Sequence, residues 1–155
     1  MHNLVKHIVK NIGISLFLLI SILITTQAHS EQSAEDIIKN RKALFSKNYN
    51  TAKKVQSLSS SGDFDAAKKL MLQMSENYKA LLEMFPDNTK EGFKTEVTSL
   101  VWEEKDKFNS LMEKSSNDMI ELASVIEETD NVRGVLGQLM WGNCKACHSK
   151  YRVEH

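Results

Sequence analysis

The sequence predicts an all-α protein, folded as an antiparallel four-helix bundle. Four stretches repeat apolar residues every three or four positions, which is the pattern of helices with one buried face, and short polar segments separate them. One proline and six glycines among 155 residues are too few for the frequent turns of a small all-β domain. The length suits one domain, and an apolar content of 41% is enough for a modest core. Short connections between such helices make consecutive helices antiparallel neighbours.

The first two helices have clear boundaries in the sequence. The first is predicted from about Ser33 to Leu58, and Ser59-Ser60-Ser61-Gly62-Asp63 breaks it. Gly62 suits the left-handed residue after a helix, and Asp63 suits the cap of the next one. The second helix is predicted from Phe64 to Phe85, where Pro86 ends it.

The third and fourth helices complete the bundle. The third is predicted from about Lys90 to Glu127, with a kink or a break at Ser115-Ser116-Asn117. The fourth is predicted from about Asp130 to Val153. Twenty basic and twenty acidic side chains balance over the whole chain, which argues against a nucleic-acid-binding protein.

Residues 1–30 have the pattern of a cleaved secretory signal peptide. Lys6 and Lys10 precede an uncharged apolar run over residues 12–24, and Ala28 and Ser30 supply the small residues that a signal peptidase needs. An uncleaved membrane anchor is the alternative, but the run is shorter than the roughly 20 residues of a spanning helix. We therefore expect a bacterial protein whose mature domain, residues 31–155, is exported to the periplasm.

The chemistry is concentrated near the C-terminus, in Cys144-Lys145-Ala146-Cys147-His148. This is C-x-x-C-H, the attachment motif of c-type haem. On a helix, positions 144, 147 and 148 are i, i+3 and i+4, so the three side chains share one face. Two sulfur atoms can then form thioethers to the haem vinyl groups, while the imidazole of His148 reaches the iron as its axial ligand.

Three other uses of these residues remain open. A thioredoxin-like dithiol also has C-x-x-C, but at a strand-to-helix junction that this helical chain does not offer. A structural zinc site could use Cys144, Cys147, His148 and His155, although adjacent ligands make tetrahedral coordination strained. A disulfide between Cys144 and Cys147 within one helical turn is sterically poor.

At this point the chain resembles the cytochrome c′ family, the class II c-type cytochromes. The resemblance covers about Ser33 to Arg152 and rests first on Cys144–His148 followed by Tyr151-Arg152. The segment Glu35-Asp36-Ile37-Ile38-Lys39-Asn40-Arg41-Lys42 and the residues Val101, Trp102 and Phe108 carry it further. It implies an up-down-up-down bundle with one covalently bound haem c.

Arg41 is conspicuous because Ile37, Arg41 and Phe45 are spaced i, i+4, i+8, which puts a guanidinium on an apolar stripe. It is either a snorkelling arginine at the edge of the core or the partner of a haem propionate. The resemblance implies propionate pairing and extends haem contact to Lys42, and more weakly to Thr95 or Glu96. It also places Arg152 beside the axial imidazole, where a cation at a helix C-terminus is the alternative.

Phe45 decides the expected ligand chemistry. The resemblance implies that the residue four after the first-helix arginine faces the distal side of the iron, where low-spin relatives supply a methionine from the first helix instead. No methionine occurs between Glu31 and Leu70, so we expect five-coordinate iron with an apolar distal pocket that admits nitric oxide and carbon monoxide. The later methionines suit core packing.

The sequence thus predicts an exported monohaem cytochrome that binds diatomic gases, transfers electrons to an unidentified redox partner, or does both, and that is not an enzyme. The resemblance adds a homodimer formed through the first two helices. Two alternatives stand beside it: a six-coordinate electron carrier whose sixth ligand is a later methionine, and a haem-free helical interaction module.

Overall fold

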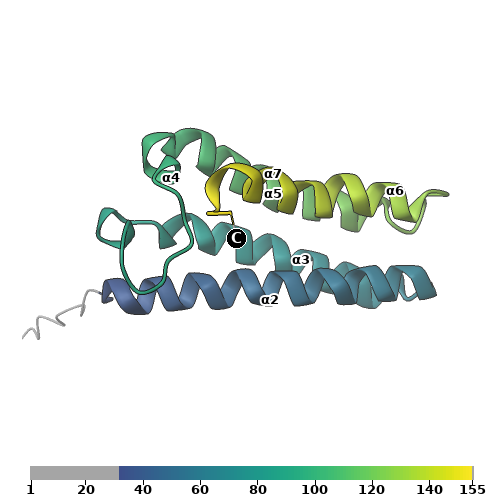
Figure 1. The fold of residues 1–155 in the computed structure, drawn as a ribbon. Helices are drawn as coiled ribbons and strands as arrows, with labels where there is room; N and C mark the ends of the chain where they lie inside the picture. Colours follow the sequence, from purple (N-terminus) through teal and green to yellow (C-terminus); the bar gives the residue numbers. More distant parts are fainter. Residues whose placement is uncertain (1–31, 155) are drawn as a thin grey trace, which may run out of the picture. The chain divides into compact units, whose positions relative to one another are not determined.

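The computed structural model describes residues 32–154, and the predicted signal peptide lies outside them. Two long helices, α2 (Ala34–Ser61) and α3 (Phe64–Leu81), form the first antiparallel pair. The helix α5 (Lys105–Val125) packs on α3, and a C-terminal run packs on α5. That run consists of α6 (Val132–Leu136), a π-helical segment (Gly137–Trp141) and α7 (Gly142–Tyr151). The four-helix bundle with alternating chain direction is therefore confirmed (Figure 1).

The break between the first two helices is where the sequence predicts it. Ser33 caps α2 by accepting a hydrogen bond from the Asp36 amide, and Asp63 caps α3 by accepting one from Ala66. Gly62 has a φ of 82°, a left-handed conformation that glycine adopts without strain. Because capping depends on neighbouring residues alone, these boundaries can be read locally.

The core is filled by side chains from all four long elements. Methionines contribute much of it, since Met71, Met74, Met112, Met119 and Met140 are all buried. Their flexible thioethers fill irregular space between helices, as the sequence predicts. Among residues 32–154, none of the helices combines the length and the apolar character that crossing a membrane requires.

The predicted start of the third helix at Lys90 is wrong. After α3 the chain forms two short 3-10 turns (Leu82–Met84 and Asp87–Thr89) and an irregular segment, and helix resumes only at α4 (Leu100–Glu103). Gly92, Phe93 and Lys94 all have positive φ, at 84°, 49° and 56°. Three consecutive left-handed residues cannot belong to a right-handed helix.

Of the two alternatives at Ser115-Ser116-Asn117, a break in the third helix is wrong, because α5 runs through these residues without interruption. Both serine hydroxyls have partners that do not disturb the helix. Ser115 donates back to the Leu111 carbonyl oxygen at 2.8 Å, and Ser116 donates to the Ser75 carbonyl oxygen on α3 at 3.1 Å. The serines are therefore packing residues rather than a break.

The end of α7 is tied to the irregular segment that precedes α4. Arg152 forms an isolated antiparallel bridge with Val97, and the Val153 amide donates to the Glu96 carbonyl oxygen at 2.8 Å. The Thr98 amide donates to the Tyr151 carbonyl oxygen at 3.1 Å. These bonds hold residues 96–98 beside the C-x-x-C-H motif.

Candidate functional site

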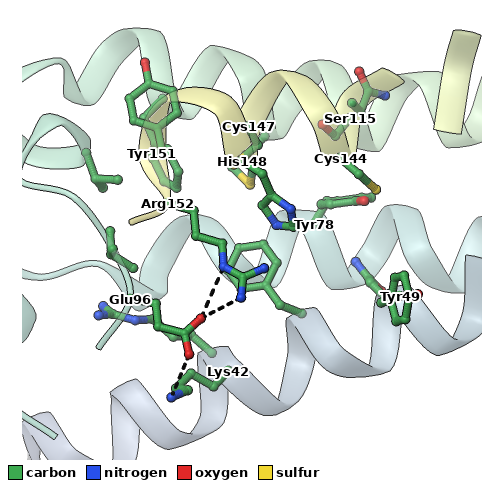
Figure 2. Close-up of a pocket in the computed structure, with 18 of the residues that line it drawn as sticks. Lys42, Tyr49, Tyr78, Glu96, Ser115, Cys144, Cys147, His148, Tyr151 and Arg152 are labelled. Carbon is green, nitrogen blue, oxygen red and sulfur yellow. Dashed lines mark hydrogen bonds and ion pairs between the residues drawn. The ribbon is translucent and has the colours of Figure 1, made fainter. Parts of the chain in front are cut away.

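A cavity of about 720 Å³ lies between α7 and α2 (Figure 2). Its walls also include side chains of α3 and α5 and of the segment before α4, and they are mostly apolar. The volume falls within the ~300–1,000 Å³ of pockets that hold cofactors. Every site residue that the sequence predicts lines this cavity: Arg41, Lys42, Phe45, Thr95, Glu96, Cys144, Cys147, His148 and Arg152.

The α7 wall carries the C-x-x-C-H side chains. Cys144, Cys147 and His148 all face the cavity, and Figure 2 shows the imidazole of His148 pointing away from α7 toward its interior. Partial burial lowers the pKa of His148, the positive charge of Arg152 lowers it further, and Glu96 opposes them. The neutral imidazole that can ligate a metal is thereby favoured.

The two thiols do not have the properties of a redox pair. Burial raises the pKa of Cys144, and burial followed by the proximity of Cys144 raises that of Cys147 to about 12. A reactive C-x-x-C dithiol needs the opposite shift, since the thiolate is the nucleophile. The two cysteines are free thiols in this structure, and His155, the fourth ligand of the zinc alternative, lies outside the described residues.

The opposite wall is formed by α2. Phe45 is half-buried, lines the cavity and meets Phe85 edge-to-face with ring centroids 6.4 Å apart. The apolar stripe differs by one residue from the predicted one, because Ile38 is buried while Ile37 is partly exposed. Phe45 and His148 therefore project from facing helices.

Arg41 is 1% exposed, so the prediction of a snorkelling edge arginine is wrong. Its two terminal nitrogens donate four hydrogen bonds, to Met84 O, Thr89 Oγ1, Thr89 O and Thr95 Oγ1, at 2.6–3.1 Å. The guanidinium also lies over the Phe85 ring at 4.8 Å. Burial lowers its pKa to about 10, and its Nε–H is buried without a hydrogen-bond partner.

Lys42, Glu96 and Arg152 form a charged cluster at the cavity (Figure 2). Arg152 donates to Glu96 Oε2 from Nη2 at 2.9 Å and from Nε at 3.2 Å. Lys42 Nζ lies 3.7 Å from Glu96 Oε1 and donates to the Lys94 carbonyl oxygen at 2.9 Å. The cluster joins α2, the segment before α4 and the end of α7.

Tyr78 and Asn48 are two of the polar cavity residues that the predicted site does not include. Tyr78 on α3 is buried, which raises its pKa, and its hydroxyl interacts with the Cys144 thiol. Asn48 is 3% exposed and lines the cavity from α2. Asn48 follows Arg41 by seven residues, two helical turns on the same face, and that spacing is the signal that could have found it.

The residues present fit a covalently attached haem. Two thiols and an imidazole share one face of α7, as the motif requires. Across the cavity, Arg41 is a buried cation with one free N–H and no carboxylate among its hydrogen-bond partners, which suits an acidic group of a bound ligand.

Comparison with known proteins agrees with this geometry. The family model described as "Cytochrome C′" matches residues 36–152. Cytochrome c′ of Rhodopseudomonas palustris is 28% identical over 122 residues, which cover 77% of this chain and 83% of that protein. Cytochrome c′ of Rhodospirillum rubrum is 34% identical over 71 residues, 45% of this chain and 48% of that protein.

Solved structures share the fold. Cytochrome c′ from Rubrivivax gelatinosus superposes with a TM-score of 0.66 at 24% identity, over 78% of this chain and 98% of that one. The cytochrome c′ structure whose source is given as Rhodobacter Spheriodes reaches a TM-score of 0.70 at 19% identity, over 80% and 100%. With the family model matching most of its length, the chain belongs to the cytochrome c′ family of haem-binding c-type cytochromes.

Proposed function

We propose that this chain is an exported monohaem cytochrome that binds small diatomic gases such as nitric oxide and carbon monoxide, transfers electrons, or does both. The observation that carries the proposal is the cavity itself, with Cys144, Cys147 and His148 on one wall and the apolar Phe45 on the facing wall. Residues 1–30 direct export to the periplasm, where the haem is attached.

The residues of the chain divide the work of holding the haem. Cys144 and Cys147 would supply the thiols for the thioether links, and His148, whose pKa is lowered by burial and by Arg152, would ligate the iron. Arg41, through its free Nε–H, and the exposed Lys42 would pair with the propionates. When bound, the haem supplies an iron that can take a diatomic ligand and change its oxidation state by one electron.

The surroundings of the cavity favour five-coordinate iron. Phe45 offers no ligand atom, and α2 carries no methionine. Among the described residues that line the cavity, Met112 is the only methionine, and it lies on α5. The six-coordinate alternative therefore reduces to Met112 as the sixth ligand.

A related structure supports gas binding as the ligand chemistry. A nitric oxide complex of a mutant of cytochrome c prime from Alcaligenes xylosoxidans has the same fold, with a TM-score of 0.68 at 17% identity. The site of this chain is a binding and electron-transfer site rather than a catalytic one. The proposal also includes electron exchange with an unidentified redox partner, and a homodimer that packs through α2 and α3.

Covalent haem is the claim to test first. The pyridine haemochrome spectrum of the full chain, expressed with its own N-terminus in a bacterium that matures c-type cytochromes, should show one haem per chain. The double variant Cys144→Ser, Cys147→Ser should show none. An absence of haem from the wild-type protein would leave the haem-free interaction module as the correct interpretation.

The optical spectrum of the ferrous protein tests the coordination number. A broad high-spin Soret band is expected, and the variant Met112→Leu should leave it unchanged. Sharp low-spin α and β bands that disappear in Met112→Leu would establish the six-coordinate electron carrier instead.

A further inference from the structure

Asn48 is a polar residue in a place where the mechanism above has no use for one. It lies on α2, three residues after Phe45, and is 3% exposed. Its side chain borders the cavity, whose walls are mostly apolar. Buried polar groups in proteins nearly always have hydrogen-bond partners, so an exception needs a physical reason.

The neighbouring helix sets the orientation of the Asn48 amide. Asn77 on α3 donates from Nδ2 to Asn48 Oδ1 at 2.7 Å, so the carbonyl end of Asn48 is the acceptor in this contact. The other end, Nδ2, is buried and makes no hydrogen bond of normal geometry, although the Asn48 amide interacts with the neighbouring Tyr78 hydroxyl. The cavity wall therefore holds a donor group that no protein acceptor satisfies at normal hydrogen-bond geometry.

The position of Asn48 relates this donor to the ligand side of the pocket. His148 enters from α7, and α2 forms the facing wall (Figure 2). A small ligand held on the side away from His148 would meet the α2 wall, where Arg41, Phe45 and Asn48 are the cavity-lining side chains that are not exposed. Phe45 can contribute only shape, whereas the Asn48 amide can donate a hydrogen bond.

We propose that Asn48 is a specificity-determining residue, donating a hydrogen bond from Nδ2 to the outer atom of a diatomic ligand in the haem pocket. This rests on the proposed function and changes it in one respect. The pocket is apolar at Phe45, but the Asn48 amide provides one hydrogen-bond donor. This donor stabilises ligands whose outer atom accepts a hydrogen bond and gives no such stabilisation to other ligands.

The infrared C–O stretching frequency of the carbon monoxide complex tests the inference, because a donor near the oxygen lowers this frequency. Asn48→Leu, which keeps the volume and removes the donor, should shift the frequency to higher wavenumber than in the wild-type protein. Asn77→Ala should raise the C–O frequency by a smaller amount. This variant removes the hydrogen bond that orients the Asn48 amide but leaves the amide donor itself in place. Ser46→Ala is the matched control, because Ser46 is an exposed residue of the same helix that also lines the cavity, and it should cause no shift.

A second measurement serves if Asn48→Leu does not fold. In the wild-type protein, exchange from H₂O into D₂O should shift the C–O frequency, and the same isotope shift should persist in Tyr78→Phe, which removes the neighbouring hydroxyl. The inference is overturned if Asn48→Leu matches the wild type, if Ser46→Ala shifts equally, or if the isotope shift is absent or vanishes in Tyr78→Phe. Failure to incorporate haem would instead overturn the proposed function, and failure of the haem-loaded protein to bind carbon monoxide would overturn its gas-binding part, so these failures are distinguishable from failure of the inference.

Discussion

Arg41 carries a positive charge into the interior of the bundle, where protein oxygen atoms compensate it. Its hydrogen bonds reach Met84, Thr89 and Thr95, all of which belong to the region between α3 and α4. The same side chain lines the cavity. Arg41 therefore holds the irregular region in place and keeps one buried N–H without a hydrogen-bond partner.

Replacing Arg41 should cost more stability than a surface substitution. Arg41→Ala leaves the acceptors of Thr89, which is fully buried, without a donor, and we expect a loss of about 3 kcal/mol in the free energy of unfolding. Urea denaturation of the haem-loaded protein measures it. Lys39→Ala, an exposed position on the same helix, should change stability by less than ~0.5 kcal/mol. Equal losses of unfolding free energy in the two variants would show that the hydrogen bonds of Arg41 do not stabilise the region between α3 and α4.

Phe45 should limit ligand entry through its size alone. Phe45→Ala opens the α2 wall of the cavity, so carbon monoxide should associate with the ferrous protein about tenfold faster, equivalent to a barrier lower by ~1.4 kcal/mol. Stopped-flow mixing measures the rate. Phe93→Ala is the control, because Phe93 is 53% exposed and does not line the cavity. An unchanged rate in Phe45→Ala would remove Phe45 as the distal gate.

At the scale of the elements, the π-helical segment Gly137–Trp141 stands directly before the helix that carries the motif. A π turn holds one more residue than an α turn, so the wide turn absorbs that residue without changing the direction of the helix that follows. Leu139 and Met140 of this segment are buried in the core, while Cys144 and His148 beyond it face the cavity. Segments of this kind often occur at functional sites.

Removing that extra residue should leave the haem-attachment residues in place. Deletion of the exposed Gln138 lets the wide turn close into an α turn with the direction of α7 unchanged, so covalent haem should be kept. Insertion of one glycine between Thr129 and Asp130, in the connection before α6, is the control and should also keep the haem. Loss of covalent haem in the deletion variant alone would show that the extra residue is needed for the direction of α7.

Glu104 links the start of α5 to the end of α7 and makes this link sensitive to acid. It pairs with Lys150 and accepts a 3.3 Å hydrogen bond from the Tyr151 hydroxyl. Hydrogen bonds from Lys150 and Lys107 lower the pKa of Glu104 from its ordinary value of 4.5. Because the folded-state pKa is the lower one, its stabilising contribution is present above pH 4.5 and is lost as the pH falls through the folded-state value.

We therefore expect Glu104→Gln to melt at a lower temperature than the wild type at pH 7 and at nearly the same temperature once the pH is well below 4.5. Thermal melts across this pH range give the difference. Glu103→Gln, at the exposed neighbouring position, should show no such pH-dependent difference. If the melting temperatures of Glu104→Gln and wild type differed by the same amount at every pH, the stabilising role of the ionised Glu104 carboxylate would be contradicted.

The whole molecule depends on what fills the cavity. Without haem, water enters a mostly apolar cavity of about 720 Å³, and the lining loses the apolar burial that a bound haem would provide. The haem-free Cys144→Ser, Cys147→Ser variant should therefore keep helical far-UV dichroism, bind the dye ANS and melt without a sharp transition. A cooperative melt at the wild-type temperature without dye binding would contradict this.

Particular residues show how much of the fold could be read in advance. The boundary at Gly62 and Asp63 was predictable because a cap depends on its immediate neighbours. The segment 90–99 was not, since its left-handed residues are stabilised by bonds to Arg41 and Lys42, about 50 positions away. The role of Ser116 could not be read from α5 alone, because its partner, Ser75, lies on another helix.

The sequence by itself determined the helical class, the family and the chemistry of α7, since the spacing of Cys144, Cys147 and His148 places them on one helical face whatever the rest of the chain does. Only the tertiary structure decided what lies opposite that face. Phe45 and Asn48 meet the same cavity as His148 although about 100 residues separate them, because the packing of α2, α3 and α5 brings the two helices to opposite walls. The same packing buries Arg41 and leaves Nδ2 of Asn48 without a hydrogen bond of normal geometry, and neither fact has a local signature in the sequence.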